Sequence, residues 1–166
     1  LRLIKSNIMD IRIGYGVDFH KLVDDHPFIL GGIEIPHHKG AIGHSDADVL
    51  LHAITDALFG ALSLGDIGSH FPDTDSAYKG IDSKILLKDC YQIIQDKGWK
   101  INNMDCTICL QAPKIRNHID TMRQVISELL SIDLDRVSIK ATTAEKMGFV
   151  GREEGVQAFA TVLITK

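Results

Sequence analysis

Hydrophobic and polar residues alternate from Ile11 to His20, which predicts a β-strand with one apolar face. The apolar positions are Ile11, Ile13, Tyr15, Val17 and Phe19. The same alternation places Asp18 and His20 on one side of the strand, about 7 Å apart along the backbone. A carboxylate and an imidazole are therefore expected to project together near the end of this strand.

Apolar residues spaced three and four apart predict a helix from Ser45 to about Leu64. Ser45 is expected to cap its N-terminus, with Asp48 supporting the cap as in a capping box. His52 lies beside the apolar face, in one stripe with Asp48 and Asp56. Metal-bound imidazoles usually donate their second N–H to a carboxylate or carbonyl. If His52 binds a metal, we therefore expect the Asp56 carboxylate to accept that N–H.

The rest of the chain alternates between strand-like and helix-like patterns. We predict a Gly-Gly hairpin at 27–36, helices at 83–97 and 115–130, strands at 104–110, 137–142 and 155–165, and loops at 65–75 and 148–152. The last strand is apolar on both faces, so it should be central or covered. The order predicts an α/β sandwich: one mostly four-stranded mixed sheet, helices packed on one face, in a ferredoxin-like arrangement.

Length and composition fit one domain, which we place at residues 10–166. The chain has 166 residues, 45% of them hydrophobic, and a formal charge of −4 without a basic stripe, which disfavours nucleic-acid binding. No apolar run approaches the roughly 20 residues that span a bilayer, so no membrane association is expected. Three cysteines argue against a disulfide framework and fit a reducing compartment, and we expect a cytoplasmic, bacterial protein. Residues 1–9 are expected to be an N-terminal extension or an expression remnant.

Asp18, His20 and His52 form the strongest candidate site if the fold brings them together. Two nitrogens and one carboxylate oxygen leave the fourth tetrahedral position of Zn²⁺ free, and the same ligands would also suit Fe²⁺ or Mn²⁺. Neither a P-loop nor a Rossmann fingerprint is present, so phosphate would be held by the helix entry near Ser45 and by basic side chains. These features favour metal-assisted chemistry on a phosphorylated substrate. The other histidines of the hairpin region, predicted to be solvated at the surface, are His26, His37 and His38.

Six blocks of the sequence, in matching order and spacing from about Arg12 to the C-terminus, resemble the family of 2-C-methyl-D-erythritol 2,4-cyclodiphosphate synthases. The blocks are Asp18–His20, Gly43–His52, Leu64–Gly68, Phe71–Asp75, Gln111–Lys114 and Lys140–Lys146. The resemblance implies a phosphorus-oxygen lyase of the non-mevalonate isoprenoid pathway. Such an enzyme converts 4-diphosphocytidyl-2-C-methyl-D-erythritol 2-phosphate to the 2,4-cyclodiphosphate and releases CMP. It also implies a homotrimer with active sites at subunit interfaces, and an apolar axial cavity in which an isoprenoid diphosphate is a candidate ligand.

The resemblance also implies roles for individual residues. The implied ligands of one Zn²⁺ per subunit are Asp18, His20 and His52. Glu145 corresponds to the ligand of a second divalent cation, Mg²⁺ or Mn²⁺, while His44 and Thr143 correspond to groups that stabilise the transition state. The positions implied to bind the substrate are Asp18, Phe19, His20, His44, Ser45, Asp66, Ile67, Gly68, Phe71, Pro72, Asp73, Thr74, Asp75, Leu110, Gln111, Ala112, Pro113, Lys114, Ile115, Arg116, Thr142, Thr143, Ala144, Glu145, Phe149 and Arg152.

Two other functions stay open at this point. A metal-dependent phosphohydrolase would use the same three ligands but release free phosphate or an uncyclised diphosphate. A non-enzymatic trimeric carrier would bind a metal or ligand tightly and consume no cytidylyl substrate.

Overall fold

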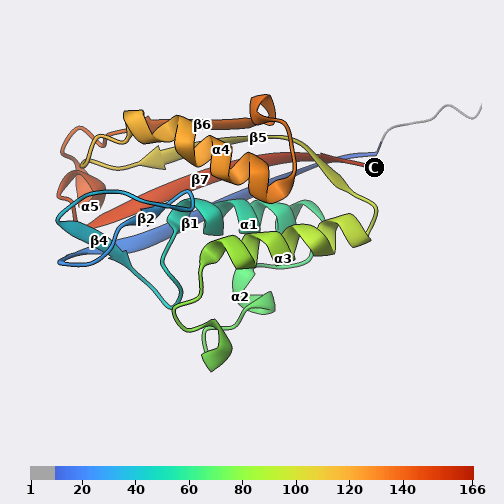
Figure 1. Cartoon of the computed structure of the whole chain (residues 1–166), viewed down its shortest axis with the longest axis horizontal. Helices are drawn as coiled ribbons and strands as arrows, with labels where there is room; N and C mark the ends of the chain where they lie inside the picture. The colour runs from blue at the N-terminus through green and yellow to red at the C-terminus, as the bar shows by residue number, and fades with distance from the viewer. Residues whose placement is uncertain (1–9) are drawn as a thin grey trace, which may run out of the picture.

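The computed structural model describes residues 10–166, so the prediction for residues 1–9 lies outside the described residues. One mixed sheet has the strand order β4-β1-β7-β5-β6 (Figure 1). Its strands are β1 Ile11–Asp24, β4 Lys39–Ile42, β5 Lys100–Cys109, β6 Val137–Thr142 and β7 Gly155–Thr165. β5 and β6 run parallel, and the other neighbours are antiparallel. The predicted mixed sheet is confirmed, with five strands instead of four because the four-residue β4 pairs with the edge of β1.

The longer helices lie on one side of this sheet (Figure 1). They are α1 Val49–Ala61, α3 Ser83–Asp96 and α4 Ile119–Leu130. The Gly-Gly hairpin is confirmed as β2 Ile29–Leu30 and β3 Ile33–Glu34. Short 3₁₀ turns occupy Ser76–Tyr78, Arg116–His118 and Leu134–Arg136. Within residues 10–166, the helices are all too short or too polar to cross a bilayer.

Two segments predicted as loops each contain one helical turn, so those predictions are wrong in part. The first turn is α2 Ile67–His70, where the Asp66 side chain caps the helix by accepting from the Ser69 N–H. The second is α5 Gly148–Gly151. Glycine and aspartate, which indicate a loop, also suit the ends of such short turns.

β7 lies in the middle of the sheet, as its apolar sequence predicts. Alternate residues of this strand are fully buried on the helix side: Val156, Ala158, Ala160, Val162 and Ile164. These side chains meet the buried face of α1, and the hydrophobic core therefore fills the layer between sheet and helices.

α1 packs directly against glycines of β1. A Cβ atom on Gly14 would lie 1.7 Å from the carbonyl oxygen of Ala57, and one on Gly16 would lie 2.0 Å from that of Ala53. Only glycine permits this approach of helix backbone to strand backbone. The close packing fixes the distance between the strand and the helix that carry the candidate ligands.

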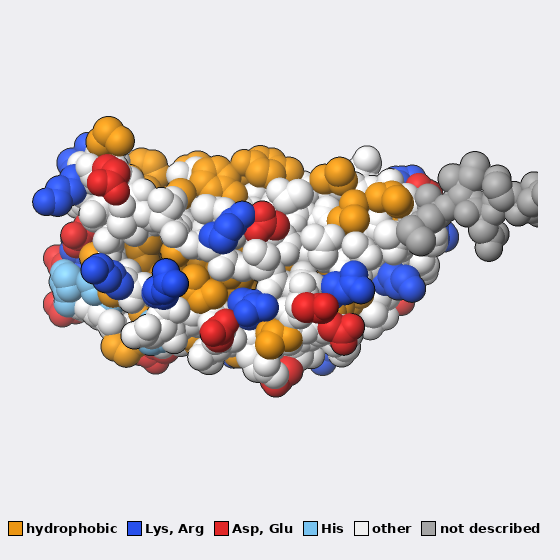
Figure 2. Space-filling view, turned by 90° about the horizontal axis from the view of Figure 1, so that it is seen from above, with side chains coloured by type: hydrophobic (Ala, Val, Ile, Leu, Met, Phe, Trp, Pro, Cys, Tyr) orange, Lys and Arg blue, Asp and Glu red, His pale blue; other side chains and the backbone are white. Residues whose placement is uncertain are grey.

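The large side chains of β1 are on the other face, where the chain itself does not cover them. Ile11, Ile13, Tyr15 and Phe19 are between 53% and 68% exposed. Figure 2 shows hydrophobic side chains gathered along one edge of the surface. The apolar face predicted for this strand is thus an exposed sheet face, which is typical of a surface that contacts another protein.

The predicted cap of the 49–61 helix is wrong, because Asp48 and not Ser45 occupies the N-cap position. The buried Asp48 carboxylate accepts four backbone hydrogen bonds, from the N–H groups of Gly31, Gly32, Leu50 and Leu51. Asp48 therefore joins the hairpin turn to the start of α1, and Ser45 is left free to face His52. The helix also ends earlier than predicted, with Leu62 as its C-cap.

Candidate functional site

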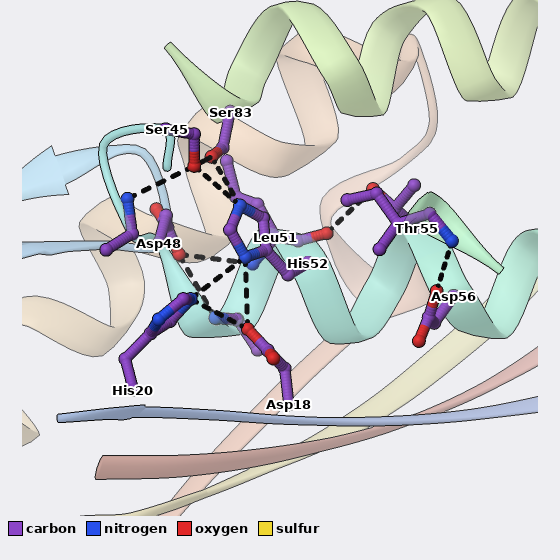
Figure 3. Close-up of polar contacts among 12 residues, drawn as sticks. Asp18, His20, Ser45, Asp48, Leu51, His52, Thr55, Asp56 and Ser83 are labelled. Atoms are coloured by element: carbon purple, nitrogen blue, oxygen red, sulfur yellow. Dashed lines mark hydrogen bonds and ion pairs between the residues drawn. The ribbon is translucent and has the colours of Figure 1, made fainter. Parts of the chain in front are cut away.

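Side chains from β1 and α1 meet at one point (Figure 3). Asp18 and His20 leave the same side of β1, and His52 reaches them from the first turn of α1. The Nδ1 atom of His52 is 3.0 Å from Asp18 Oδ2 and 3.0 Å from His20 Nε2. The His20 Nε2 atom is itself 2.9 Å from Asp18 Oδ2. The fold therefore brings together three side chains that form a potential metal site.

The chemistry of these three donors fits a divalent transition metal. Two ring nitrogens face one another at 3.0 Å with a carboxylate oxygen beside both, so the donor atoms converge on a common space. The side chains are partly buried, with exposed fractions of 14% for His20, 12% for His52 and 27% for Asp18. Two imidazoles and one carboxylate are a common ligand set for zinc and leave a coordination position open.

Burial and hydrogen bonding act in opposite directions on the protonation of this cluster. Burial alone would raise the pKa of Asp18, but hydrogen bonds from His20 and His52 bring it well below its usual range. Burial alone would lower the pKa of His52, but the hydrogen bond to Asp18 raises it. Asp18 is therefore an anion in the folded protein, which is the form that binds a metal.

The second ring nitrogen of His52 meets hydroxyl groups instead of a carboxylate. Its Nε2 atom is 3.0 Å from Ser45 Oγ and 2.8 Å from Ser83 Oγ. The Ser83 hydroxyl donates its proton to Asp46 Oδ1, and the Ser83 backbone N–H donates to Asp46 Oδ2. Because this hydroxyl has one proton, its oxygen accepts the Nε2–H of a neutral His52. With the Nε2 proton held in this way, a cation would replace the proton on Nδ1 and bind the lone pair that faces Asp18 and His20.

Asp56 does not contact His52, so the prediction of a supporting carboxylate is wrong. Its Oδ1 atom accepts the Ile67 N–H at 2.7 Å and thereby ties α1 to α2. A spacing of four residues places two side chains on one helix face but does not make them partners. The actual partner, Ser83, comes from the start of α3, and the sequence carries no local signal for that contact.

A cavity of about 290 Å³ opens beside the three ligands. Its lining is His20, His44, Ser45, His52, Ile67, Gly68, Phe71, Asp73, Tyr78, Ile81 and Leu86. Most of these were expected to bind substrate, and the structure places them together. Sequence reasoning missed the last three, which follow the expected loop and give the cavity an apolar wall.

Several expected substrate residues do not line this cavity. Asp66 and Asp75 instead cap the short helical turns that follow them. Pro72 and Thr74 alternate with lining residues along the same loop. These four therefore shape the loop of residues 66–75, whereas Phe71 and Asp73 reach the cavity.

A second pocket, of about 160 Å³, shares no lining residue with the first. It is lined by Leu110, Gln111, Pro113, Lys114, Ile115, Arg116, Ala141, Thr142 and Thr143. These are most of the residues expected to hold cytidine diphosphate. The Ala112–Pro113 peptide bond beside it is cis. The expected residues that do not line it are Ala112, Ala144 and Glu145. Glu145 nevertheless contacts the pocket, because its Oε1 accepts from Thr143 Oγ1 at 3.0 Å.

Phe149 and Arg152, the last two expected substrate residues, line neither cavity. The Phe149 ring on α5 lies 6.0 Å from that of Phe19, centre to centre, beside the exposed face of β1. Arg152 forms an exposed ion pair with Glu154 at 2.9 Å.

The fold and the cluster define an α/β protein with a potential metal site and a cavity beside it. The chain belongs to the YgbB family, which it matches over residues 11–165. A curated relative, 2-C-methyl-D-erythritol 2,4-cyclodiphosphate synthase of Bacteroides fragilis, is 56% identical over 158 residues, 95% of this chain and 99% of the relative. The family resemblance inferred from the sequence blocks is thereby confirmed.

Solved structures of other proteins are also similar to this chain. The bifunctional IspDF from Campylobacter jejuni matches with a TM-score of 0.91 and 39% identity over 95% of this chain, which spans 42% of that longer protein. A 2C-methyl-D-erythritol-2,4-cyclodiphosphate synthase in its CDP-bound form matches with a TM-score of 0.86 and 37% identity, covering 92% of this chain and 99% of the other.

Proposed function

We propose that this protein catalyses the reaction for which its relatives are named, a cyclisation in the non-mevalonate isoprenoid pathway. It converts 4-diphosphocytidyl-2-C-methyl-D-erythritol 2-phosphate to 2-C-methyl-D-erythritol 2,4-cyclodiphosphate and releases CMP. The observation that carries the proposal is the convergence of Asp18, His20 and His52 beside a cavity, in a chain 56% identical to a synthase of that name.

The reaction is an intramolecular displacement at phosphorus. An oxygen of the 2-phosphate attacks the β-phosphorus, the bond from this phosphorus to the bridging oxygen breaks, and CMP leaves with that oxygen. The protein needs to contribute little covalent chemistry, because the main requirements are alignment and charge neutralisation. Favourable orientation alone is worth about 7–11 kcal/mol in ideal cases.

The chain offers ligands for two cations. Asp18, His20 and His52 would hold the first, for which two imidazoles and a carboxylate favour Zn²⁺. Glu145 would hold the second, Mg²⁺ or Mn²⁺, because an oxygen ligand suits these harder ions. When bound, the cations neutralise phosphate charge and polarise the phosphorus centre. Ser45 and Ser83 contact the Nε2 atom of His52, so Nδ1 is the ring nitrogen that would bind the first cation.

The remaining residues bind and orient the substrate. His44, at the cavity beside the first site, and Thr143, in the second pocket, donate to phosphate oxygens and stabilise the transition state. The loop of residues 66–75 holds the erythritol part. The second pocket, with the 110–116 and 142–145 segments, holds the cytidine diphosphate part.

The enzyme is a homotrimer whose subunits complete one another's sites. The exposed apolar face of β1 supports this arrangement, since a monomer would leave several large side chains in water. The separation of the two pockets supports it as well, because one chain's metal site then meets a neighbour's cytidine pocket. Residues 10–166 form the single catalytic domain of each subunit. An isoprenoid diphosphate would occupy the trimer axis near Phe149 and Arg152.

Product analysis tests the reaction. The protein is incubated with the cytidylyl substrate, CMP is quantified by chromatography, and the phosphorus products are identified by ³¹P NMR. We expect CMP and a cyclic diphosphate in equal amounts, no inorganic phosphate, and loss of turnover after metal chelation. Release of inorganic phosphate or of an uncyclised diphosphate would instead indicate a phosphohydrolase, and no consumption would indicate a carrier.

Two substitutions link the reaction to the site. His52→Ala and Asp18→Ala should abolish CMP formation, because each removes one of three ligands. Asp56→Asn is the matched control on the same helix face and should retain turnover, since Asp56 contacts Ile67 and not His52. CMP formation at the unsubstituted rate in both ligand variants would refute the metal assignment.

A further inference from the structure

Two of the histidines predicted to be solvated form a cluster with a carboxylate, away from the first metal site. His37 and His38 immediately precede β4, and Glu153 lies in the turn between α5 and β7. One ligand atom from each of the three lies within 4.8 Å of the other two. The prediction is wrong for His37, which is partly buried, whereas His26 and His38 are exposed.

The backbone brings the neighbouring imidazoles to the same side. Successive side chains of a strand point to opposite faces, but the chain bends at His38 before β4 begins. The ring centres of His37 and His38 are consequently 4.3 Å apart. The bend thus makes two adjacent residues into a pair of potential ligands facing one carboxylate.

His37 supplies a second, independent observation. Its Nε2 atom is the one buried side-chain nitrogen or oxygen in residues 10–166 that has no hydrogen-bond partner. Buried polar atoms almost always have a partner, and those without one in the protein itself often contact a bound water or ion. Burial also lowers the pKa of His37, which keeps the imidazole neutral and able to bind a metal.

We propose that His37, His38 and Glu153 form a further metal site, separate from the two cation sites proposed above, that takes a borderline divalent ion such as Zn²⁺, Ni²⁺ or Co²⁺. Two imidazoles with one carboxylate favour these ions, whereas Mg²⁺ and Ca²⁺ prefer oxygen ligands alone. The Lys39 ammonium group donates to the Glu153 carbonyl oxygen at 3.1 Å, so a positive charge lies close by. This charge should make the site weaker than that of Asp18, His20 and His52.

A bound ion would join two segments that are far apart in the sequence. Backbone hydrogen bonds already connect this region, from Asp25 N–H to the His38 carbonyl and from Leu22 N–H to the Glu154 carbonyl, both 2.9 Å long. β4 and α5 lie at the same end of the sheet, and Figure 2 shows histidine side chains on the surface at that end. Binding to the folded state alone stabilises it, so the ion should raise the melting temperature.

Metal counting on the full-length protein tests the proposal. The protein is stripped with a chelator, titrated with Zn²⁺ without substrate, and analysed by isothermal titration calorimetry and elemental analysis. We expect two ions per chain, one tight and one weaker. His38→Ala and Glu153→Gln should each remove only the weaker ion, and His52→Ala only the tight one. Loss of a direct ligand should cost more than the roughly 10–100-fold that loss of an outer partner costs.

Matched controls separate this site from the first metal site and from neighbouring histidines. His26→Ala removes a nearby exposed histidine outside the cluster and should keep both ions. In the His52→Ala background, Zn²⁺ should still raise the melting temperature, and adding His38→Ala should abolish that rise. CMP formation by His38→Ala should equal that of the unsubstituted protein, so failure of this proposal and failure of the proposed function are distinguishable.

Three results would overturn the proposal. The first is a single Zn²⁺ per chain that His52→Ala removes. The second is a weaker ion that both His38→Ala and Glu153→Gln leave in place. The third is a weaker ion that is lost in Glu145→Gln instead, which would place it beside Thr143.

Discussion

At the scale of single residues, a chain of hydrogen bonds through the Ser83 hydroxyl determines which ring nitrogen of His52 can bind a metal. We call this chain, from His52 through Ser83 to Asp46, the hydroxyl relay. The Ser83 hydroxyl donates a hydrogen bond to Asp46 and accepts one from the Nε2–H of His52, so Nδ1, beside Asp18, is the ring nitrogen that a cation would bind. A carboxylate contacting His52 directly would achieve the same tautomer. Here the Asp46 carboxylate acts indirectly, through Ser83 at the start of α3.

Removing this relay should weaken metal binding. Ser83→Ala is expected to lower Zn²⁺ affinity at the first site by about 10–100-fold, the usual cost of losing an outer-shell partner. Competition with a chromophoric chelator measures the affinity. Asp56→Asn should leave it unchanged, because Asp56 bonds to the Ile67 backbone. Equal Zn²⁺ affinities in Ser83→Ala and the unsubstituted protein would show that the relay does not help His52 to bind the metal.

At the scale of elements, the site depends on the distance between α1 and β1. Gly14 and Gly16 allow the helix to lie against the strand backbone, and the helix then delivers His52 to Asp18 and His20. Asp48 fixes where that helix starts by accepting from the hairpin turn as well as from the helix. The packing of α1 on β1 and the Asp48 cap therefore position the three ligand side chains, in addition to the hydrogen bonds among those side chains.

A side chain at the helix–strand contact should destabilise the fold. Gly16→Ala places a Cβ atom 2.0 Å from a backbone oxygen, so we expect a loss of about 3 kcal/mol or more in the free energy of unfolding. Urea denaturation measures it. Gly60→Ala on α1 is the matched control: its Cβ atom would lie 3.9 Å from the nearest atom. That change should be neutral or stabilising by up to about 1 kcal/mol. Similar effects of both substitutions would contradict the packing argument.

The sequence predicts the elements better than it predicts their connections. Periodicity depends on which face is buried, so β1, α1 and β7 could be recognised, as could the shared side of Asp18 and His20. The Asp48 cap could not, because two of its donors come from a hairpin turn 16 and 17 residues away. Ser83 is 31 residues from His52, and such contacts exist only in the folded chain. His37 likewise meets Glu153, 116 residues further along the sequence, only in the folded chain.

At the scale of the whole molecule, the two halves of the proposed active site lie in different parts of one chain. The cavity at the first metal site and the 110–116 pocket have no lining residue in common. An exposed apolar sheet face provides the surface on which copies of the chain would associate. Catalysis and assembly are therefore coupled in this proposal, because a lone subunit would lack half of each site.

Mixing two inactive variants tests the shared site. His52→Ala removes the first half and Glu145→Ala the second, so each should be inactive alone. Mixed trimers co-expressed from both should recover about a third of full activity, because each mixed closed ring pairs two intact halves at one of its three interfaces. CMP release by affinity-purified mixed trimers is the measurement. No recovery from mixed trimers would place both halves of the site within one subunit.

The most direct test of the central claim is anomalous diffraction at the zinc absorption edge, on crystals grown with Zn²⁺. The account predicts a peak about 2.0–2.2 Å from Asp18 Oδ2, His20 Nε2 and His52 Nδ1. A map with no peak among these three atoms, while they remain in direct contact with one another, would contradict the claim. A peak confined to His37, His38 and Glu153 would contradict it too, although it would support the further metal site proposed there.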